Sequence, residues 1–209
     1  MVRAVTGGDD KLRRLAAAHF PSEGGLTMPG ISQWGLTDGM KLARTVGRHL
    51  SDRQTYSPQE FIEAAEKAAR EQPNEWVIWF TLGDKYQATG QYVQSLQACK
   101  RCVELRPNDI RSAYALATAY NILTRASWTT IEPHITALTA FLGTQGIDKF
   151  SPRQSELALA EADMVIDTAA AQAMRWFERA LQLNPDASSL AQIRQDLGTL
   201  YQRFPHLQS

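Results

Sequence analysis

Two cysteines separated by two residues are the part of this sequence whose types and spacing most directly suggest chemistry. Cys99 and Cys102 are the only cysteines in the chain, within the stretch QACKRCVELRPND. A C-x-x-C pair can form a redox couple or half of a zinc site. A zinc site needs two further ligands, and the sequence holds no second C-x-x-C and no H-x(3)-H to supply them. The surrounding residues therefore have to decide between thiol chemistry and a packing role.

Other patterns that could carry catalysis are weak. The four histidines are scattered along the sequence and form no H-E-x-x-H: His19, His49, His134 and His206. Two carboxylate couples have a spacing that could serve acid and base catalysis: Glu161 with Asp163, and Glu63 with Glu66. Charged residues along a helix ordinarily form its solvated face, and histidines of this kind are usually surface or cap residues. With no P-loop, G-x-S-x-G or G-x-G-x-x-G, we expect no enzymatic activity, no metal and no cofactor.

Charge and hydropathy exclude further classes. The 209 residues include 22 Lys and Arg and 22 Asp and Glu, so the formal net charge is zero. Proteins that bind nucleic acid or membrane surfaces generally need a basic excess. The one local basic cluster is KLRR at 11–14, which we interpret as a solvated helix face. No run approaches 18 apolar residues and the start lacks a signal-like apolar segment, so we expect a cytoplasmic protein without membrane insertion.

The N-terminal region, residues 1–37, differs from the rest and is interpreted as an arm. A short helix is expected within DDKLRRLAAAHF, followed by a segment rich in glycine and proline without any sustained period. The arm carries more large apolar side chains than a free linker needs: Phe20, Leu26, Met28, Ile31 and Trp34. We therefore expect these residues to make contacts, either with the same chain or with a partner.

From residue 38 onward the pattern is helical and it repeats. Pro73 and Pro107 lie 34 residues apart in the similar stretches REQPNE and ELRPND, and Pro185 follows in QLNPDA. The stretch WFTLGDKY, which contains Trp79, Leu82, Gly83 and Tyr86, opens the unit between the first two prolines. These residues resemble the tetratricopeptide repeat, whose units are 34 residues long and open with W-x(2)-L-G-x(2)-Y.

The residues of this unit have definite physical roles. Trp79, Leu82 and Tyr86 lie on one face of the first helix, which we expect to pack against the second helix at 92–105. Gly83 permits close approach of the two helices. Gly90 is expected to end the first helix in a left-handed conformation, and Pro107 to end the second. In this register Cys99 and Cys102 are inward, small packing residues of the second helix, equivalent to Ala65 and Ala68 and close to Trp176 and Ala180.

The predicted fold is all-α: an α-solenoid like that of the tetratricopeptide repeats, with a repeat domain at 38–209. Four units of two helices are expected at about 38–75, 76–109, 110–153 and 154–187, followed by a capping helix at 188–204. Ser57 and Pro58 are expected to start the second helix of the first unit. In the third unit the second helix is expected near 132–143, before an insertion around 142–150.

The resemblance implies a binding surface and no reaction. In this family the concave face, lined mainly by first helices, holds a peptide or a helix of another protein. The equivalent positions here form the candidate binding face: Val77, Phe80, Asp84, Gln87, Arg111, Tyr114, Thr118 and Asn121. Packing against a neighbouring unit is an equally good interpretation of Phe80 and Tyr114.

Three functions follow from these patterns. The first is a non-catalytic scaffold or adaptor that binds a partner protein through the candidate binding face. The second is a structural or assembly subunit of a larger complex, docked through its arm and convex face, with its own arm in the groove. The third, a thiol switch or metal protein built on Cys99 and Cys102, requires accessible thiols.

Overall fold

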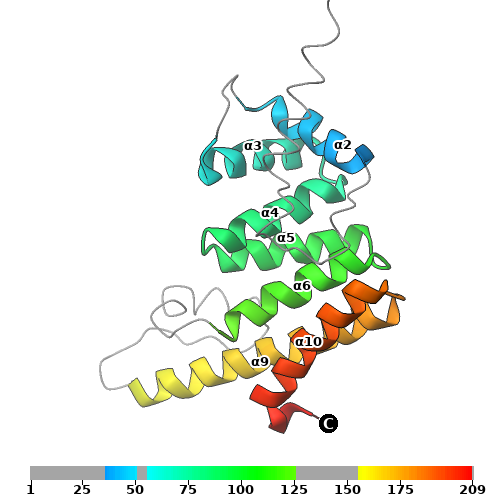
Figure 1. The fold of residues 1–209 in the computed structure, drawn as a ribbon. Helices are drawn as coiled ribbons and strands as arrows, with labels where there is room; N and C mark the ends of the chain where they lie inside the picture. Colours follow the sequence, from blue (N-terminus) through cyan, green and yellow to red (C-terminus); the bar gives the residue numbers. More distant parts are fainter. Residues whose placement is uncertain (1–35, 51–55, 126–154, 209) are drawn as a thin grey trace, which may run out of the picture.

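The computed structural model describes residues 36–50, 56–125 and 155–208, and every regular element in these ranges is a helix (Figure 1). They are α2 (Leu36–Gly47), α3 (Pro58–Glu71), α4 (Trp76–Ala88), α5 (Tyr92–Leu105), α6 (Ile110–Leu123), α9 (Ser155–Gln182), α10 (Ala187–Arg203) and the short 3-10 helix η3 (Pro205–Leu207). The predicted all-α class is confirmed for these residues.

The helices pack as a stack of sequential neighbours (Figure 1). Helix α4 packs against α3 and α5, α5 packs against α6, and α4 also contacts α2 and α6. Helices α4 and α6 are buried on nearly all sides, because most of their residues are apolar or small. The core therefore runs along the middle of the stack.

The boundaries of several helices follow from the predicted signals. Ser57 caps α3 through a capping box, in which its side chain accepts from Glu60 N and its own N–H donates to the Glu60 carboxylate. Pro58 is the first residue of that helix. Gly90 has a φ of +75°, a conformation that glycine adopts without a side-chain clash, directly after α4. The predicted second helix at 92–105 is confirmed as α5.

Gly83 lies where α4 and α5 approach most closely. A Cβ atom at this position would lie 2.6 Å from Cys99 Sγ, which is closer than real Cβ contacts occur. The Ser95 hydroxyl donates to the Gly83 carbonyl at 2.8 Å across the same contact. The role predicted for Gly83 is therefore confirmed.

The apolar stripe of α4 is divided between two neighbours. The Tyr86 hydroxyl donates to Glu66 of α3 at 2.7 Å, so the expectation that Tyr86 faces α5 is wrong. Trp79 is half-buried, and its indole N–H donates to the Pro73 carbonyl at 2.8 Å. A first helix inside a stack lies between its own second helix and that of the preceding unit, so one stripe serves both.

The expected fourth unit is not a pair of helices. Helix α9 runs without a break for 28 residues, where a helix pair was expected at about 154–187. Its sequence contains no glycine and no proline and is rich in alanine, leucine and glutamate, so nothing interrupts the hydrogen-bond ladder. The expectation of two helices followed from the 34-residue period alone and was wrong.

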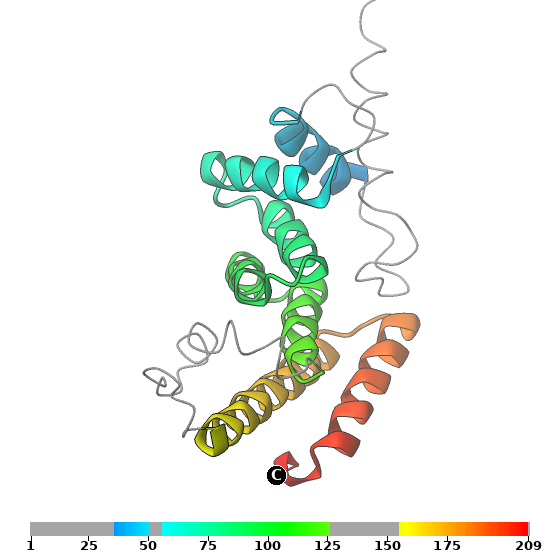
Figure 2. The same cartoon turned by 90° about the vertical axis from the view of Figure 1, so that its left-hand side faces the viewer.

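The helix that packs against α6 is α9, as α5 packs against α4. Figure 2 shows α9 crossing beneath α6 and α10 diverging from it in a V. The second helix expected near 132–143 and the insertion around 142–150 lie outside the described residues. Helix α10 confirms the predicted helix at 188–204 to within one residue at each end.

A pair of polar contacts repeats along the stack with the spacing of the prolines. Arg101 of α5 donates to Asn74 Oδ1 at 3.2 Å, and Arg179 of α9 donates to Asn108 Oδ1 at 2.9 Å. Asn74 and Asn108 lie 34 residues apart, as Pro73 and Pro107 do. The C-terminal half of α9 thus occupies, relative to α6, the place that α5 occupies relative to α4.

Candidate functional site

The candidate binding face belongs to two neighbouring helices. Val77, Phe80, Asp84 and Gln87 lie on α4, and Arg111, Tyr114, Thr118 and Asn121 lie on α6. Because α4 and α6 pack against each other, the structure brings the two rows together. None of the eight residues is more than half-buried on the exposed side of the scale; four are buried: Val77, Phe80, Tyr114 and Asn121.

The two aromatic residues of the face make packing contacts. The Phe80 ring meets the Trp76 ring edge to face at a centroid distance of 5.8 Å. The Tyr114 ring packs on Phe177 of α9 in the same way at 5.6 Å, and its hydroxyl donates to Asp196 of α10 at 2.9 Å. Burial, with the adjacent Asp196 carboxylate, raises the pKa of Tyr114 well above its ordinary value. Contact with partner protein stays a prediction for both residues.

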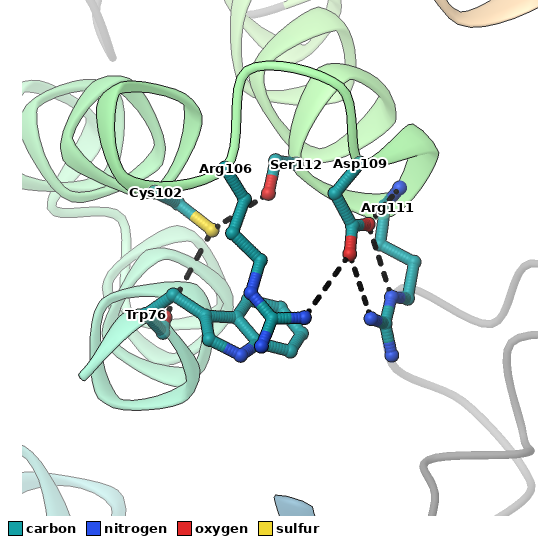
Figure 3. A network of polar contacts seen from close by, with 6 residues as sticks. All are labelled: Trp76, Cys102, Arg106, Asp109, Arg111 and Ser112. Atoms are coloured by element: carbon teal, nitrogen blue, oxygen red, sulfur yellow. Dashed lines mark hydrogen bonds and ion pairs between the residues drawn. The ribbon is translucent and has the colours of Figure 1, made fainter. Parts of the chain in front are cut away.

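Arg111 belongs to a network at the turn between α5 and α6 (Figure 3). Asp109 caps α6 by accepting from Arg111 N, and its carboxylate accepts from the Arg111 guanidinium at 3.1 and 2.7 Å. Arg106 lies 3.5 Å from the same carboxylate. The two guanidinium carbons lie 4.3 and 4.5 Å from the centroid of the Trp76 ring. The network joins α4 to the start of α6 through cation–π contacts and an ion pair.

The charges of this network compensate one another. Burial alone would raise the pKa of Asp109, but the hydrogen bonds and charge of Arg111, with the charge of Arg106, outweigh burial and lower that pKa. The Arg111 guanidinium is therefore already engaged by a carboxylate within the chain. This engagement disfavours a site in which Arg111 clamps the carboxylate of an acidic peptide.

Gln87 is the polar residue of the face with an unmet hydrogen bond. Its Oε1 atom is buried and has no donor among the residues that the structure describes. By contrast, Asn121 at the equivalent place on α6 accepts from Thr124 Oγ1 at 3.3 Å. A buried acceptor without a donor costs about 1–3 kcal/mol. The last turn of α4 thus offers an acceptor that an incoming N–H group would satisfy.

Both cysteines are packing residues. Their side chains are fully buried, as are those of Ala65 and Ala68 at the equivalent positions of α3. Burial raises the pKa of the Cys99 thiol far above its usual value and that of Cys102 to about 12. The Cys102 Sγ atom lies 3.1 Å from Ser112 Oγ. The accessible thiols that a redox or metal role requires are therefore contradicted by this structure.

Residues considered for catalysis occupy ordinary structural places where they are described. Glu66 accepts from Tyr86, while Glu63 and Asp163 are exposed. His49 lies 3.3 Å from Glu71, and His206 lies 3.0 Å from Asp167. Within the described ranges no three His, Cys, Asp or Glu side chains are grouped so that they could hold a metal ion. His19, His134 and the side chain of Glu161 lie outside the described residues.

The apolar arm residues also lie outside the described residues: Phe20, Leu26, Met28, Ile31 and Trp34. In the described part of the chain, no helix combines the length and the apolar character needed to cross a bilayer.

Sequence reasoning missed two features. Trp176, expected near the inward position of the last unit, is only half-buried, whereas Phe177 is fully buried. The 78-residue spacing from Pro107 to Pro185, applied to Cys99, leads to Phe177 and could have identified it. The contacts of Arg106 and Arg111 with Trp76 had no such signal, because they depend on side-chain direction at a turn.

No protein-family model matches the sequence, and no curated protein matches it either.

Proposed function

We propose that the protein is a non-catalytic interaction scaffold of the tetratricopeptide-repeat type, which binds an extended segment of another protein along the candidate binding face. The buried, unsatisfied Oε1 atom of Gln87 carries this proposal. A peptide backbone supplies N–H groups at regular intervals, and one of them would complete the hydrogen bonding of this atom.

The architecture supports the same proposal. The close contact of Gly83 with Cys99, the left-handed Gly90 and the repeated Asn–Arg contact are what stacked helix pairs of one repeating unit would produce. First helices of successive units then present equivalent positions side by side, as Gln87 and Asn121 are on α4 and α6. An extended segment crossing both helices would meet an amide side chain at each step.

The test is affinity capture from a cell extract, followed by mass spectrometry and by measurement of the affinity of the purified partner. Gln87→Leu keeps the size of the side chain and removes the acceptor, so partner affinity should fall about 5- to 10-fold, corresponding to one net hydrogen bond. Gln97→Leu makes the same change at an exposed position of α5 and should leave affinity unchanged. Equal affinities for the two variants would show that the partner does not use this face.

A further inference from the structure

The candidate binding face has little accessible surface as it stands. Val77 and Phe80 on α4 and Tyr114 on α6 have exposed fractions of 0%, 6% and 7%. The polar contacts of α4 with α3 and α5 involve Tyr86 and Gly83, which lie on other sides of the helix. A partner segment therefore does not meet an open apolar groove, and a segment that fills this face is part of the resting protein.

The chain itself holds a segment of the required length and position. Residues 1–35 join the described structure at Leu36, the first residue of α2. Helix α2 packs against α4, and Lys41 forms an ion pair of 3.6 Å with Glu75 at the start of α4. An extended segment of this length reaches up to about 115 Å, several times the roughly 20 Å length of α4. The segment can thus run the whole length of the face.

The chemistry of the segment fits the face. Leu26, Ile31 and Trp34 are apolar, as Val77 and Phe80 are, and they occur where glycine and proline prevent the backbone from pairing its N–H groups in a helix. Such a backbone has free N–H donors to offer to Gln87 Oε1. A tethered segment also has an effective concentration in the millimolar range, so a weak contact is populated within one chain.

We propose that residues 20–34 of the same chain occupy the candidate binding face, with a backbone N–H donating to Gln87 Oε1, and that a partner must displace them. Naming this face as the partner site rests on the proposed function. The presence of the segment there does not, because it follows from the burial of the face and the position of Leu36. The segment is then an intramolecular competitor that lowers partner affinity.

Photo-crosslinking of the full chain tests the proposal. Benzoyl-phenylalanine replaces Trp34, which lies outside the described core, and the crosslinks are mapped by mass spectrometry in an equal mixture of heavy- and light-isotope protein. We expect crosslinks to α4 or α6 within chains of one isotope. Benzoyl-phenylalanine in place of the exposed Gln97 of α5 is the matched control and should not reach residues 20–34. Crosslinks between isotopes, or none to α4 and α6, would overturn the proposal.

Hydrogen exchange gives a second readout that does not depend on the crosslinker. In the full chain with Leu26→Ser, Ile31→Ser and Trp34→Ser, amides in the last turn of α4 should exchange several-fold faster than in the unchanged chain, while those of α5 stay the same. Unchanged exchange in α4 would count against the proposal. Intrachain crosslinks with no Gln87-dependent partner would refute only the proposed function, whereas a Gln87-dependent partner without such crosslinks would refute only this inference.

Discussion

Gly83 and Gly198 occur in the same short pattern, L-G-x-x-Y, in α4 and α10, yet their surroundings differ. A Cβ on Gly83 would collide with Cys99 Sγ at 2.6 Å, whereas a Cβ on Gly198 would meet nothing within 4 Å. Gly83→Ala should therefore destabilise the protein by about 1–2 kcal/mol, because overpacking exceeds the gain in helix propensity. Gly198→Ala should stabilise it by up to about 1 kcal/mol. Urea unfolding measures both changes.

The collision at Gly83 has its own control. Cys99→Ala removes the Sγ atom, so adding Gly83→Ala to that variant should cost less than adding it to the unchanged chain. If the cost of Gly83→Ala were the same in both backgrounds, the collision with Cys99 would not be its cause.

Asp109 predicts a dependence of stability on pH. Its pKa in the folded protein lies below the ordinary 3.8, so the network stabilises the fold fully above that ordinary value. The stabilisation is lost as the pH falls through the lower, folded pKa, because protonation removes the contact with Arg111. Asp109→Asn should therefore lower the free energy of unfolding near neutral pH and flatten its decline below pH 4. Urea unfolding between pH 2 and 6 compares the two proteins, and parallel curves would contradict this assignment.

At this scale the sequence predicted backbone roles better than side-chain partners. Gly83, Gly90 and Ser57 could be assigned because a glycine or a capping residue has few physical explanations. Phe80 and Tyr114 could not, since an aromatic side chain at helical spacing packs against a neighbouring helix as readily as it faces a partner. Gln87 could not be singled out, because an unsatisfied acceptor is visible only once the surrounding donors are placed.

Among the elements, α10 is attached to α6 by polar contacts that can be tested separately. Tyr114→Phe removes the hydrogen bond to the Asp196 carboxylate inside the α6–α10 contact and should cost about 1.5 kcal/mol. Tyr201→Phe removes a hydrogen bond of similar length, 2.6 Å to Glu178, at an exposed position. Its cost should stay below about 0.5 kcal/mol. Thermal or urea unfolding of the two variants gives the comparison, and equal costs would exclude a special contribution of the α6–α10 contact.

The helices that could be predicted are those whose ends carry signals. Helix α5 lies between Gly90 and Pro107, and α10 begins after Asp186, whose side chain accepts from Ser189 N. Helix α9 was mispredicted because a period was applied where no residue could end a helix. The pairing of α6 with α9 could not be foreseen either, since consecutive helices are usually neighbours and the chain between these two is long.

For the whole molecule, the repeated Asn–Arg contact implies that α6 and the C-terminal half of α9 form one ordinary unit with extra chain between its helices. Replacing residues 126–165 by the three-residue turn Asn-Gly-Asn should then leave a chain that unfolds cooperatively, because α6 and the second half of α9 are retained. Circular dichroism during thermal unfolding measures this. A broad, non-cooperative transition would show that the removed residues hold the two helices together.

The shortened chain needs evidence that its core is native. Phe177→Ala should cost about 3–5 kcal/mol in both the full and the shortened chain, because Phe177 packs against Tyr114 in either. A much smaller cost in the shortened chain would mean that α9 no longer lies on α6.

The continuity of α9 has a mechanical consequence. With 28 residues the helix is about 42 Å long, whereas α6, with 14, is about 21 Å, so roughly half of α9 extends past the helix it packs against. An unbroken helix behaves as a stiff lever over this distance. A load applied to its free half would therefore tilt the half that carries Phe177, and through it the contact with α10. An event at one end of the stack is in this way coupled to the other side of α6 without any change in the first helices between.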